Sequence, residues 1–258
     1  MWRKWGLEKV GTRRIDCVET FLCDKVLDFR QTNIMEELKN RSDALEYLKI
    51  AVTGGIGSGK STVCKKIKEL GYSVFSCDEI YASMLKDMEF SSALEILFPG
   101  STNGGCVNKQ ALLCTVLRDK KALETLNAFT HPKIMARLFE MMDEAAVKGK
   151  SRCFSQKFEK NKNILVFAEV PLLFEGKYDR LFDKIIVVKR NETEKIRSVI
   201  ERDGCKENVV KEKMALQFDY SLLPKKENYP SFDKISFLEN NDSLEGLETK
   251  IKKIIQIF

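Results

Sequence analysis

The sequence predicts an α/β fold with a parallel five-stranded sheet flanked by helices. Short apolar segments alternate with segments of helical spacing from residue 49 onward, which is the pattern of strands joined by crossover helices. Two of these segments, 164–168 and 185–188, are apolar throughout, as strands covered on both faces are. The chain has 258 residues, of which 43% are hydrophobic, and is therefore long enough to bury such a core.

Each element follows from its local pattern. The β-prone apolar segments predict strands at 50–53, 72–75, 164–168, 185–188 and 233–238. Helical spacing predicts helices at 60–70, 78–86, 192–202, 206–218 and 243–257, and mostly helical chain over 90–148 with breaks at 99–100 and 103–105. We expect Pro132 to begin a new helix, because the first helical position tolerates proline. The basic polar stretch 148–163 is interpreted as a solvated surface insertion.

The first 48 residues differ from the rest of the chain. Three leucines between residues 38 and 48 have helix-like spacing, so we expect a partly helical, non-catalytic extension ahead of a domain at 49–258. Residues 1–14 lack the apolar region of a secretory signal, and acidic residues such as Glu8 and Asp16 are unusual in a transit peptide.

Cysteine usage and charge limit the function classes. The eight cysteines form no C-x-x-C pair and His131 is the only histidine, which speaks against a zinc site. We therefore expect reduced thiols in a cytoplasmic protein rather than a disulfide framework. The net charge of +6 suits anionic ligands, but no long basic run interleaved with aromatics indicates nucleic acid. No uncharged apolar run reaches the roughly 18 residues that cross a membrane, and nothing indicates an obligate protein partner.

One segment carries phosphate chemistry. Residues 54–61, Gly-Gly-Ile-Gly-Ser-Gly-Lys-Ser, fit G-x-x-x-x-G-K-[ST] between a predicted strand and a predicted helix. Glycines let backbone N–H groups converge on phosphate oxygens, and the helix N-terminus adds partial positive charge. In this motif Lys60 reaches the β- and γ-phosphates and Ser61 binds Mg²⁺. The residues expected to bind the nucleotide are Gly55, Ile56, Gly57, Ser58, Gly59, Lys60, Ser61 and Thr62.

Such a phosphate-binding loop (P-loop) does not separate a kinase from a GTPase, an ATPase motor or a helicase. The guanine-reading N-K-x-D and the D-x-x-G of a GTPase do not occur in the sequence, and a helicase would need more chain and a larger basic surface. The length favours a small-molecule kinase.

Around this loop the sequence resembles the dephospho-coenzyme A kinase family. Residues 51–63 are similar to the family's opening segment, and Phe75-Ser-Cys-Asp-Glu-Ile80 is similar to the end of its second strand. Asp78 stands on the second aspartate of the family's D-x-D pattern, whereas Ser76 replaces the first and Lys109 stands where arginine is frequent.

Further matches follow in the same order over residues 49–257. His131-Pro132 matches the family's histidine–proline pair, and residues 171–175, Pro-Leu-Leu-Phe-Glu, match its P-L-L-x-E motif. The family's R…R…Q spacing and late asparagine are matched by Arg197, Arg202, Gln217 and Asn240-Asn241.

The resemblance implies ATP-dependent phosphorylation of the ribose 3′-hydroxyl of dephospho-coenzyme A, the last step of coenzyme A synthesis, with ATP as co-substrate and Mg²⁺ as cofactor. It implies a P-loop NTPase-type fold with a helical substrate-binding portion at about 85–150 and a lid at about 192–220. The catalytic residues would be Lys60, Asp78, Arg197 and Arg202, and the substrate-binding residues Asp78 and His131.

Each of these residues has a plainer interpretation. Asp78 is also placed to cap a helix, and His131 to shape the helix start at Pro132. Glu169 follows an apolar strand at the edge where ligands gather, so it is a candidate for holding Mg²⁺ through water, or else a capping carboxylate. Arg197 and Arg202 would otherwise lie on a solvated helix face.

Two other functions stay open at this point. One is another P-loop kinase, with a nucleoside or nucleotide as acceptor. The other is a regulatory protein that binds a nucleotide without turnover.

Overall fold

The computed structural model describes residues 47–116, 118–155, 164–215, 217–220, 223 and 232–258. The segment with helix-like spacing in the extension lies outside these residues up to residue 46, and Leu48 at its end begins a strand instead. Among the described residues, Cys64, Cys77, Cys106, Cys114 and Cys205 are free thiols. Within the same part of the chain, none of the helices combines the length and the apolar content that crossing a membrane requires.

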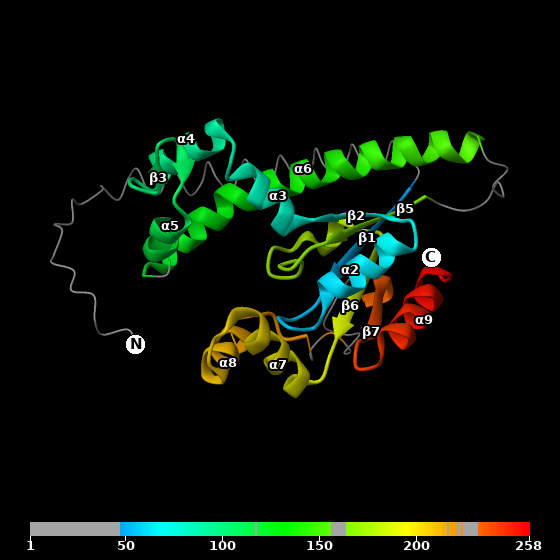
Figure 1. The fold of residues 1–258 in the computed structure, drawn as a ribbon. Helices are drawn as coiled ribbons and strands as arrows, with labels where there is room; N and C mark the ends of the chain where they lie inside the picture. Colours follow the sequence, from blue (N-terminus) through cyan, green and yellow to red (C-terminus); the bar gives the residue numbers. More distant parts are fainter. Residues whose placement is uncertain (1–46, 117, 156–163, 216, 221–222, 224–231) are drawn as a thin grey trace.

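A five-stranded sheet forms the centre of the molecule (Figure 1). Its strands are β1 (Leu48–Thr53), β2 (Ser73–Ser76), β5 (Leu165–Glu169), β6 (Lys184–Lys189) and β7 (Ile235–Glu239). They lie in the order β2-β5-β1-β6-β7, and every neighbouring pair is parallel. The predicted parallel sheet is therefore confirmed, and the carboxyl ends of all five strands meet at one edge.

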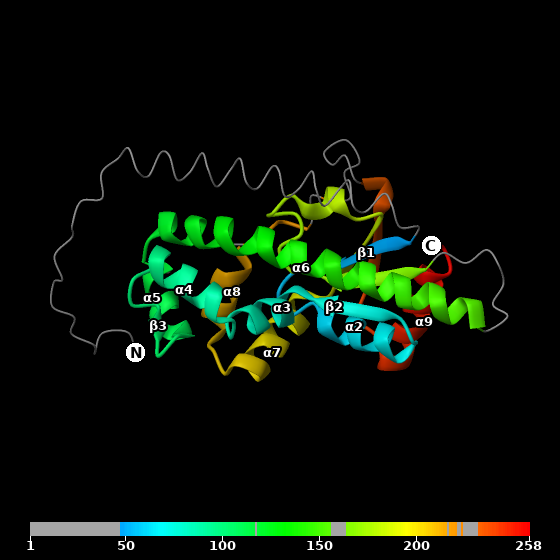
Figure 2. The same cartoon turned by 90° about the horizontal axis from the view of Figure 1, so that it is seen from above.

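Helices cover both faces of this sheet (Figures 1 and 2). Helices α2 (Lys60–Glu69) and α9 (Leu244–Ile255) share one apolar cluster with Ile50 and Val52 of β1. Helices α3 (Cys77–Met84) and α6 (Lys120–Ser155) share another with Ala51 of β1. Successive residues of a strand point to opposite faces, so continuously apolar strands fill both layers.

A smaller apolar cluster holds a helical portion beside the sheet. It contains α4 (Met88–Leu97), the hairpin of β3 (Thr102–Asn103) and β4 (Cys106–Val107), α5 (Lys109–Val116) and the first turns of α6. The predicted break at 103–105 is this hairpin's turn, where Gly104 and Gly105 have φ of 60° and 80°. A tight two-residue hairpin turn requires positive φ at both central residues. The sequence predicted a break here but did not predict the two short strands on either side of it.

The expectation that Pro132 begins a helix is wrong. Helix α6 starts at Lys120 and runs through Pro132 to Ser155. A proline inside a helix costs about 3 kcal/mol, because it removes one backbone hydrogen bond. Apolar residues on both sides of the proline, such as Leu126, Leu138 and Met142, are buried in the core, and their packing offsets this cost.

The first half of the stretch 148–163, interpreted as a surface insertion, is a continuation of α6. Helix α6 continues to Ser155, whereas residues 156–163 lie outside the described part of the chain. Residues 148–155 include the good helix formers lysine and arginine, and no proline stops the helix after the buried Ala146.

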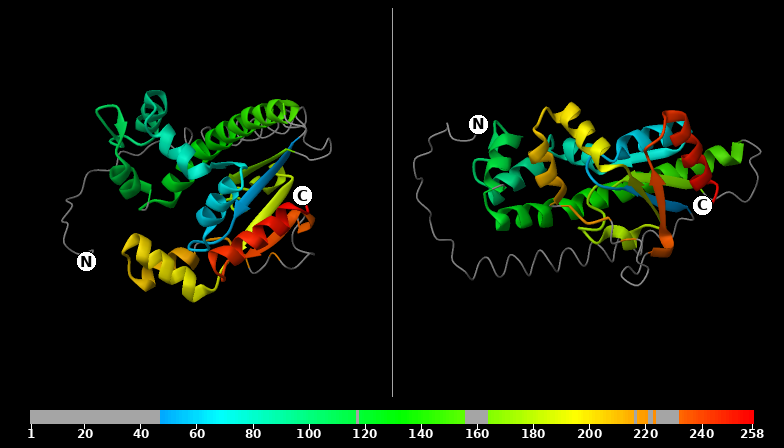
Figure 3. Two further views of the ribbon diagram at one scale, coloured as in Figure 1. Left: turned by 45° about the vertical axis from the view of Figure 1, so that its right-hand side comes forward. Right: turned by 90° about the horizontal axis from the view of Figure 1, so that it is seen from below.

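Two helices project beyond the carboxyl edge of the sheet on the side opposite α4 and α5 (Figure 3). They are α7 (Glu192–Asp203) and α8 (Glu207–Ala215), and they share a small cluster formed by Ile196, Val199 and Val210. Helix α8 ends earlier than predicted. Beyond its end, the side chain of Gln217 accepts a hydrogen bond from Ile56 in the loop that follows β1.

Candidate active site

The glycine-rich loop connects β1 to α2 at the carboxyl edge, as predicted. Two of its glycines are required by their surroundings. Gly57 has a φ of 73°, and a Cβ there would overlap the carbonyl oxygen of Lys195 in α7. Gly59 has a φ of 88°, and a Cβ there would overlap the side-chain amide of Asn240. The loop is therefore enclosed by segments that are distant in sequence.

Lys60 is the first residue of α2, and its side chain folds back over the loop. Its Nζ donates hydrogen bonds to the carbonyl oxygens of Gly54 at 2.8 Å and Gly55 at 3.1 Å. Burial lowers the pKa of Lys60, whereas the charges of Glu169 and Asp78 act to raise it. The ammonium group of Lys60 thus lies over the loop, within electrostatic range of the carboxylates of Glu169 and Asp78.

Ser61 and Glu169 face each other across the base of the loop. The hydroxyl of Ser61 donates a hydrogen bond of 2.9 Å to Oε1 of Glu169, which is the last residue of β5 and is buried. Burial raises the pKa of Glu169, and the bond from Ser61 and the charge of Lys60 oppose this shift. A hydroxyl and a carboxylate are hard oxygen ligands, so this pair fits Mg²⁺.

Asp78 lies in the first turn of α3, directly after β2, and is exposed. The helix begins at Cys77, with Ser76 in the N-cap position, so the interpretation of Asp78 as the helix cap is wrong. The carboxylate acts electrostatically on both Lys60 and Glu169. The sheet order explains this convergence, because β2 and β5 are neighbours and Ser76 is in register with Glu169.

Asp78 also lines a cavity of about 290 Å³ between α3, α5, α6 and the segment after β5. The wall is largely apolar and includes Pro171 and Leu172 of the P-L-L-x-E segment. His131 lines the same cavity from within α6, so the expectation that it shapes a helix start is wrong. Burial lowers the pKa of His131, and its ring packs edge-on against Tyr178 with centroids 6.3 Å apart.

The two predicted lid arginines lie on α7 and are exposed. Arg197 pairs along its own helix with Glu194 at 2.8 Å and Glu201 at 3.7 Å. Arg202 pairs with Asp203 at 2.7 Å, and its charge acts on both Lys60 and Asp78. The structure thus places Arg202 in electrostatic range of the loop lysine, whereas Arg197 pairs with carboxylates of its own helix.

A sequence model described as dephospho-CoA kinase matches residues 48–227 of this chain. The chain belongs to the dephospho-CoA kinase family. A dephospho-CoA kinase of Thermus thermophilus is 30% identical over 206 residues, which cover 80% of this chain and 89% of the relative. One from Bartonella quintana is 35% identical over 139 residues, or 54% of this chain and 65% of the relative. Among solved structures, TT1252 from Thermus thermophilus is similar with a TM-score of 0.64 at 28% identity, covering 83% of this chain and 98% of that one.

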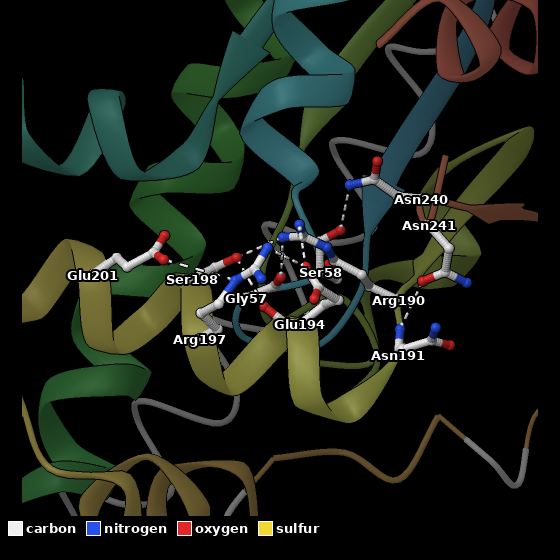
Figure 4. Close-up of polar contacts among 10 residues, drawn as sticks. All are labelled: Gly57, Ser58, Arg190, Asn191, Glu194, Arg197, Ser198, Glu201, Asn240 and Asn241. Carbon is white, nitrogen blue, oxygen red and sulfur yellow. Dashed lines mark hydrogen bonds and ion pairs between the residues drawn. The ribbon is translucent and has the colours of Figure 1, made fainter. Parts of the chain in front are cut away.

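In this dephospho-CoA kinase family member, residues that follow β6 and β7 lie beside the phosphate loop (Figure 4). Asn240 donates from Nδ2 to the carbonyl oxygen of Ser58 at 2.9 Å, and the backbone N–H of Asn191 donates to Oδ1 of Asn241 at 2.8 Å. Gln217 accepts at Oε1 from the backbone N–H of Ile56 at 2.7 Å. The amide residues Gln217 and Asn240, which the family resemblance pointed to, thus both bond to the loop.

The sequence reading missed Arg190. This residue follows β6 directly, and its Nη1 lies 3.4 Å from the carbonyl oxygen of Gly57. The sequence holds only a partial signal for it. Glu169 directly follows the apolar segment 164–168, whereas Lys189 directly follows the segment 185–188 and Arg190 comes one residue later.

Proposed function

We propose that this kinase transfers the γ-phosphoryl group of ATP to the ribose 3′-hydroxyl of dephospho-coenzyme A, giving coenzyme A and ADP. The observation that carries the proposal is the position of Asp78. This carboxylate belongs to the wall of the cavity and also acts on the charge of Lys60. An acceptor hydroxyl held beside Asp78 would therefore face a phosphoryl group bound at the loop.

The donor half of the reaction belongs to the P-loop. Backbone N–H groups of the loop and of the first turn of α2 would bind the ATP phosphates, and Lys60 would exchange its carbonyl partners for phosphate oxygens. Ser61 would ligate Mg²⁺, with Glu169 holding it through water. When bound, Mg²⁺ neutralises charge on the phosphate oxygens.

The acceptor half belongs to the cavity and Asp78. The 3′-oxygen forms the new bond to the γ-phosphorus, the bond from that phosphorus to the β,γ-bridging oxygen breaks, and Asp78 accepts the hydroxyl proton. The apolar wall would take the body of the acceptor, with His131 as a polar contact. Arg202 and Arg197 of α7 would approach the transferring group, because such a transfer depends on positioning and on neutralised charge.

An acceptor screen with coupled detection of ADP tests this proposal. Dephospho-coenzyme A, nucleosides and nucleotides are offered separately with ATP and Mg²⁺, and products are identified by mass. We expect ADP release that requires dephospho-coenzyme A. Release with a nucleoside or nucleotide instead would indicate another P-loop kinase, and ATP binding without ADP release would indicate a regulatory protein. The free thiols among the described cysteines support a cytoplasmic reaction.

A further inference from the structure

Arg190 joins the phosphate loop to the first turns of α7 (Figure 4). Its Nη1 donates to the Ser198 hydroxyl at 2.6 Å and to the carbonyl oxygen of Gly57 at 3.4 Å. Its Nη2 lies 3.4 Å from Oε2 of Glu194. The side chain is only 23% exposed, and its Nε is buried without a hydrogen-bond partner among the described residues. One guanidinium therefore bridges three backbone or side-chain groups on two separate segments.

Apolar packing brings the same two segments together. Ile56 of the loop packs on the cluster formed by Ile196 and Val199 of α7. Gly57 passes so close to α7 that a Cβ would overlap the carbonyl oxygen of Lys195. Apolar packing has little directional preference, whereas hydrogen bonds depend on distance and angle. The polar contacts of Arg190 therefore define the orientation and the position of α7 relative to the loop.

The partners of Arg190 on α7 are themselves held in place. The Ser198 hydroxyl donates to the carbonyl oxygen of Glu194 at 2.8 Å, which leaves its lone pair directed to Arg190. The Glu194 carboxylate also accepts from Nη2 of Arg197 at 2.8 Å. The half-buried Arg190 and the exposed Arg197 thus share one carboxylate.

We propose that Arg190 is a positioning residue that fixes α7, and with it Arg197 and Arg202, relative to the phosphate loop. This inference rests on the proposed function only in assigning the two α7 arginines to the γ-phosphoryl group. Arg190 acts through Ser198 and Glu194, not by contact with the nucleotide. An arginine is needed because a planar guanidinium reaches several acceptors at fixed angles, whereas an ammonium group is a single point of charge.

Enzyme kinetics provide the first test, with the variants Arg190→Ala, Arg190→Lys, Ser198→Ala and the double variant Arg190→Ala/Ser198→Ala. We expect kcat of Arg190→Ala to fall by roughly 10- to 100-fold while the Kd for ADP changes by less than about threefold, because the loop itself is kept. The double variant should lose no more than Arg190→Ala alone, since both changes break the same link. Arg190→Lys should recover only part of the loss. Arg137→Ala, which removes an exposed arginine paired with Glu140 on α6, is the matched control and should behave as wild type.

Three outcomes of measurements on these variants would overturn the proposal. A Kd for ADP that rises in step with the loss of kcat would show that Arg190 contacts the nucleotide. Losses that multiply in the double variant would show that it does not act through Ser198. A lowered melting temperature with normal kcat would show a purely structural role.

Hydrogen–deuterium exchange tests the same link without any catalysis. In the nucleotide-free protein, Arg190→Ala should speed amide exchange within residues 192–203 by about tenfold and leave the strands unchanged. Unchanged exchange in α7 would refute the proposal even if dephospho-coenzyme A proves not to be the acceptor. Should Arg190→Ala fail to fold, Ser198→Ala removes the shortest contact while keeping the buried charge, and the same exchange result is expected of it.

Discussion

Asp78 carries the chemistry of the proposed reaction at the scale of single residues. We expect Asp78→Asn to lower kcat by roughly 10²- to 10⁴-fold, because asparagine keeps the shape but neither accepts the proton nor carries the charge. Its melting temperature should stay near wild type, since Asp78 is exposed and is not the helix cap. Glu79→Gln is the control, because Glu79 is the next residue in the same first turn and is also exposed.

A Mg²⁺ series separates the two ways in which Asp78 could act. A defect that shrinks at high Mg²⁺ would show that Asp78 holds the metal through water. A variant that turns over at the wild-type rate at every Mg²⁺ concentration would remove Asp78 from the chemistry.

His131 gives a pH dependence whose sign follows from its environment. Burial lowers the pKa of His131 below the ordinary 6.5, so the unfolded chain takes up a proton at a higher pH than the folded chain. The free energy of unfolding therefore falls as pH drops from about 7 through 6.5 to the lowered pKa, by at most about 1.4 kcal/mol per pH unit. His131→Asn removes this contribution. The difference in unfolding free energy between wild type and variant should shrink at acid pH, whereas a constant difference from pH 5 to 8 would contradict the assignment.

At the scale of elements, the phosphate loop and α7 depend on each other through Gly57. Gly57→Ala and Gly71→Ala both place alanine at a positive φ, which costs about 1–2 kcal/mol in each case. Only the first also meets a neighbour, because a Cβ on Gly71 has open space. We expect both variants to be destabilised, and only Gly57→Ala to raise the KM for ATP by about tenfold or more. Equal KM values would mean that the approach of α7 to the loop does not matter for ATP.

Local sequence patterns predict some helix and strand boundaries of this chain but not others. The apolar segments were sufficient to predict all five strands, because β1, β5 and β6 are buried on both faces and the edge strands β2 and β7 still carry apolar, β-prone residues. The course of α6 through Pro132 was not predictable locally, since burial of residues such as Leu138 against the sheet decides it. Helix α8 ends early because Gln217 bonds to Ile56, a partner 161 positions away. Both differences come from tertiary contacts that no short window of sequence contains.

At the scale of the whole molecule, parallel strands gather the site at one edge. Lys60, Asp78 and Glu169 lie at or just beyond the carboxyl ends of three different strands. The motif spacing selected Lys60, the strand-end position selected Glu169, and the family resemblance selected Asp78. Arg190 follows a fourth strand and acts through α7, so its role depends on how α7 packs on the loop. This packing is visible only in the structure.

The residues ahead of β1 give a prediction at the same scale. Strand β1 begins at Leu48, and the family match begins at residue 48 as well. Tyr47 is buried and its hydroxyl donates to Asp143 at 2.8 Å, so a truncation should keep it. We expect deletion of residues 1–40 to leave kcat/KM within about threefold of wild type. A soluble truncated protein with normal ATP affinity and no phosphorylation of dephospho-coenzyme A would mean that the extension helps to form the acceptor site.

The most direct test of the account is the position of the transferred phosphate. Wild-type protein is incubated with ATP, Mg²⁺ and either dephospho-coenzyme A or its 3′-deoxy analogue, and the product is examined by phosphorus–proton correlation NMR. We expect one new phosphate on the ribose 3′-oxygen, with ADP formed in equal amount, and no transfer to the analogue. A phosphate on any other atom, or equal ADP release with the 3′-deoxy analogue, would contradict it.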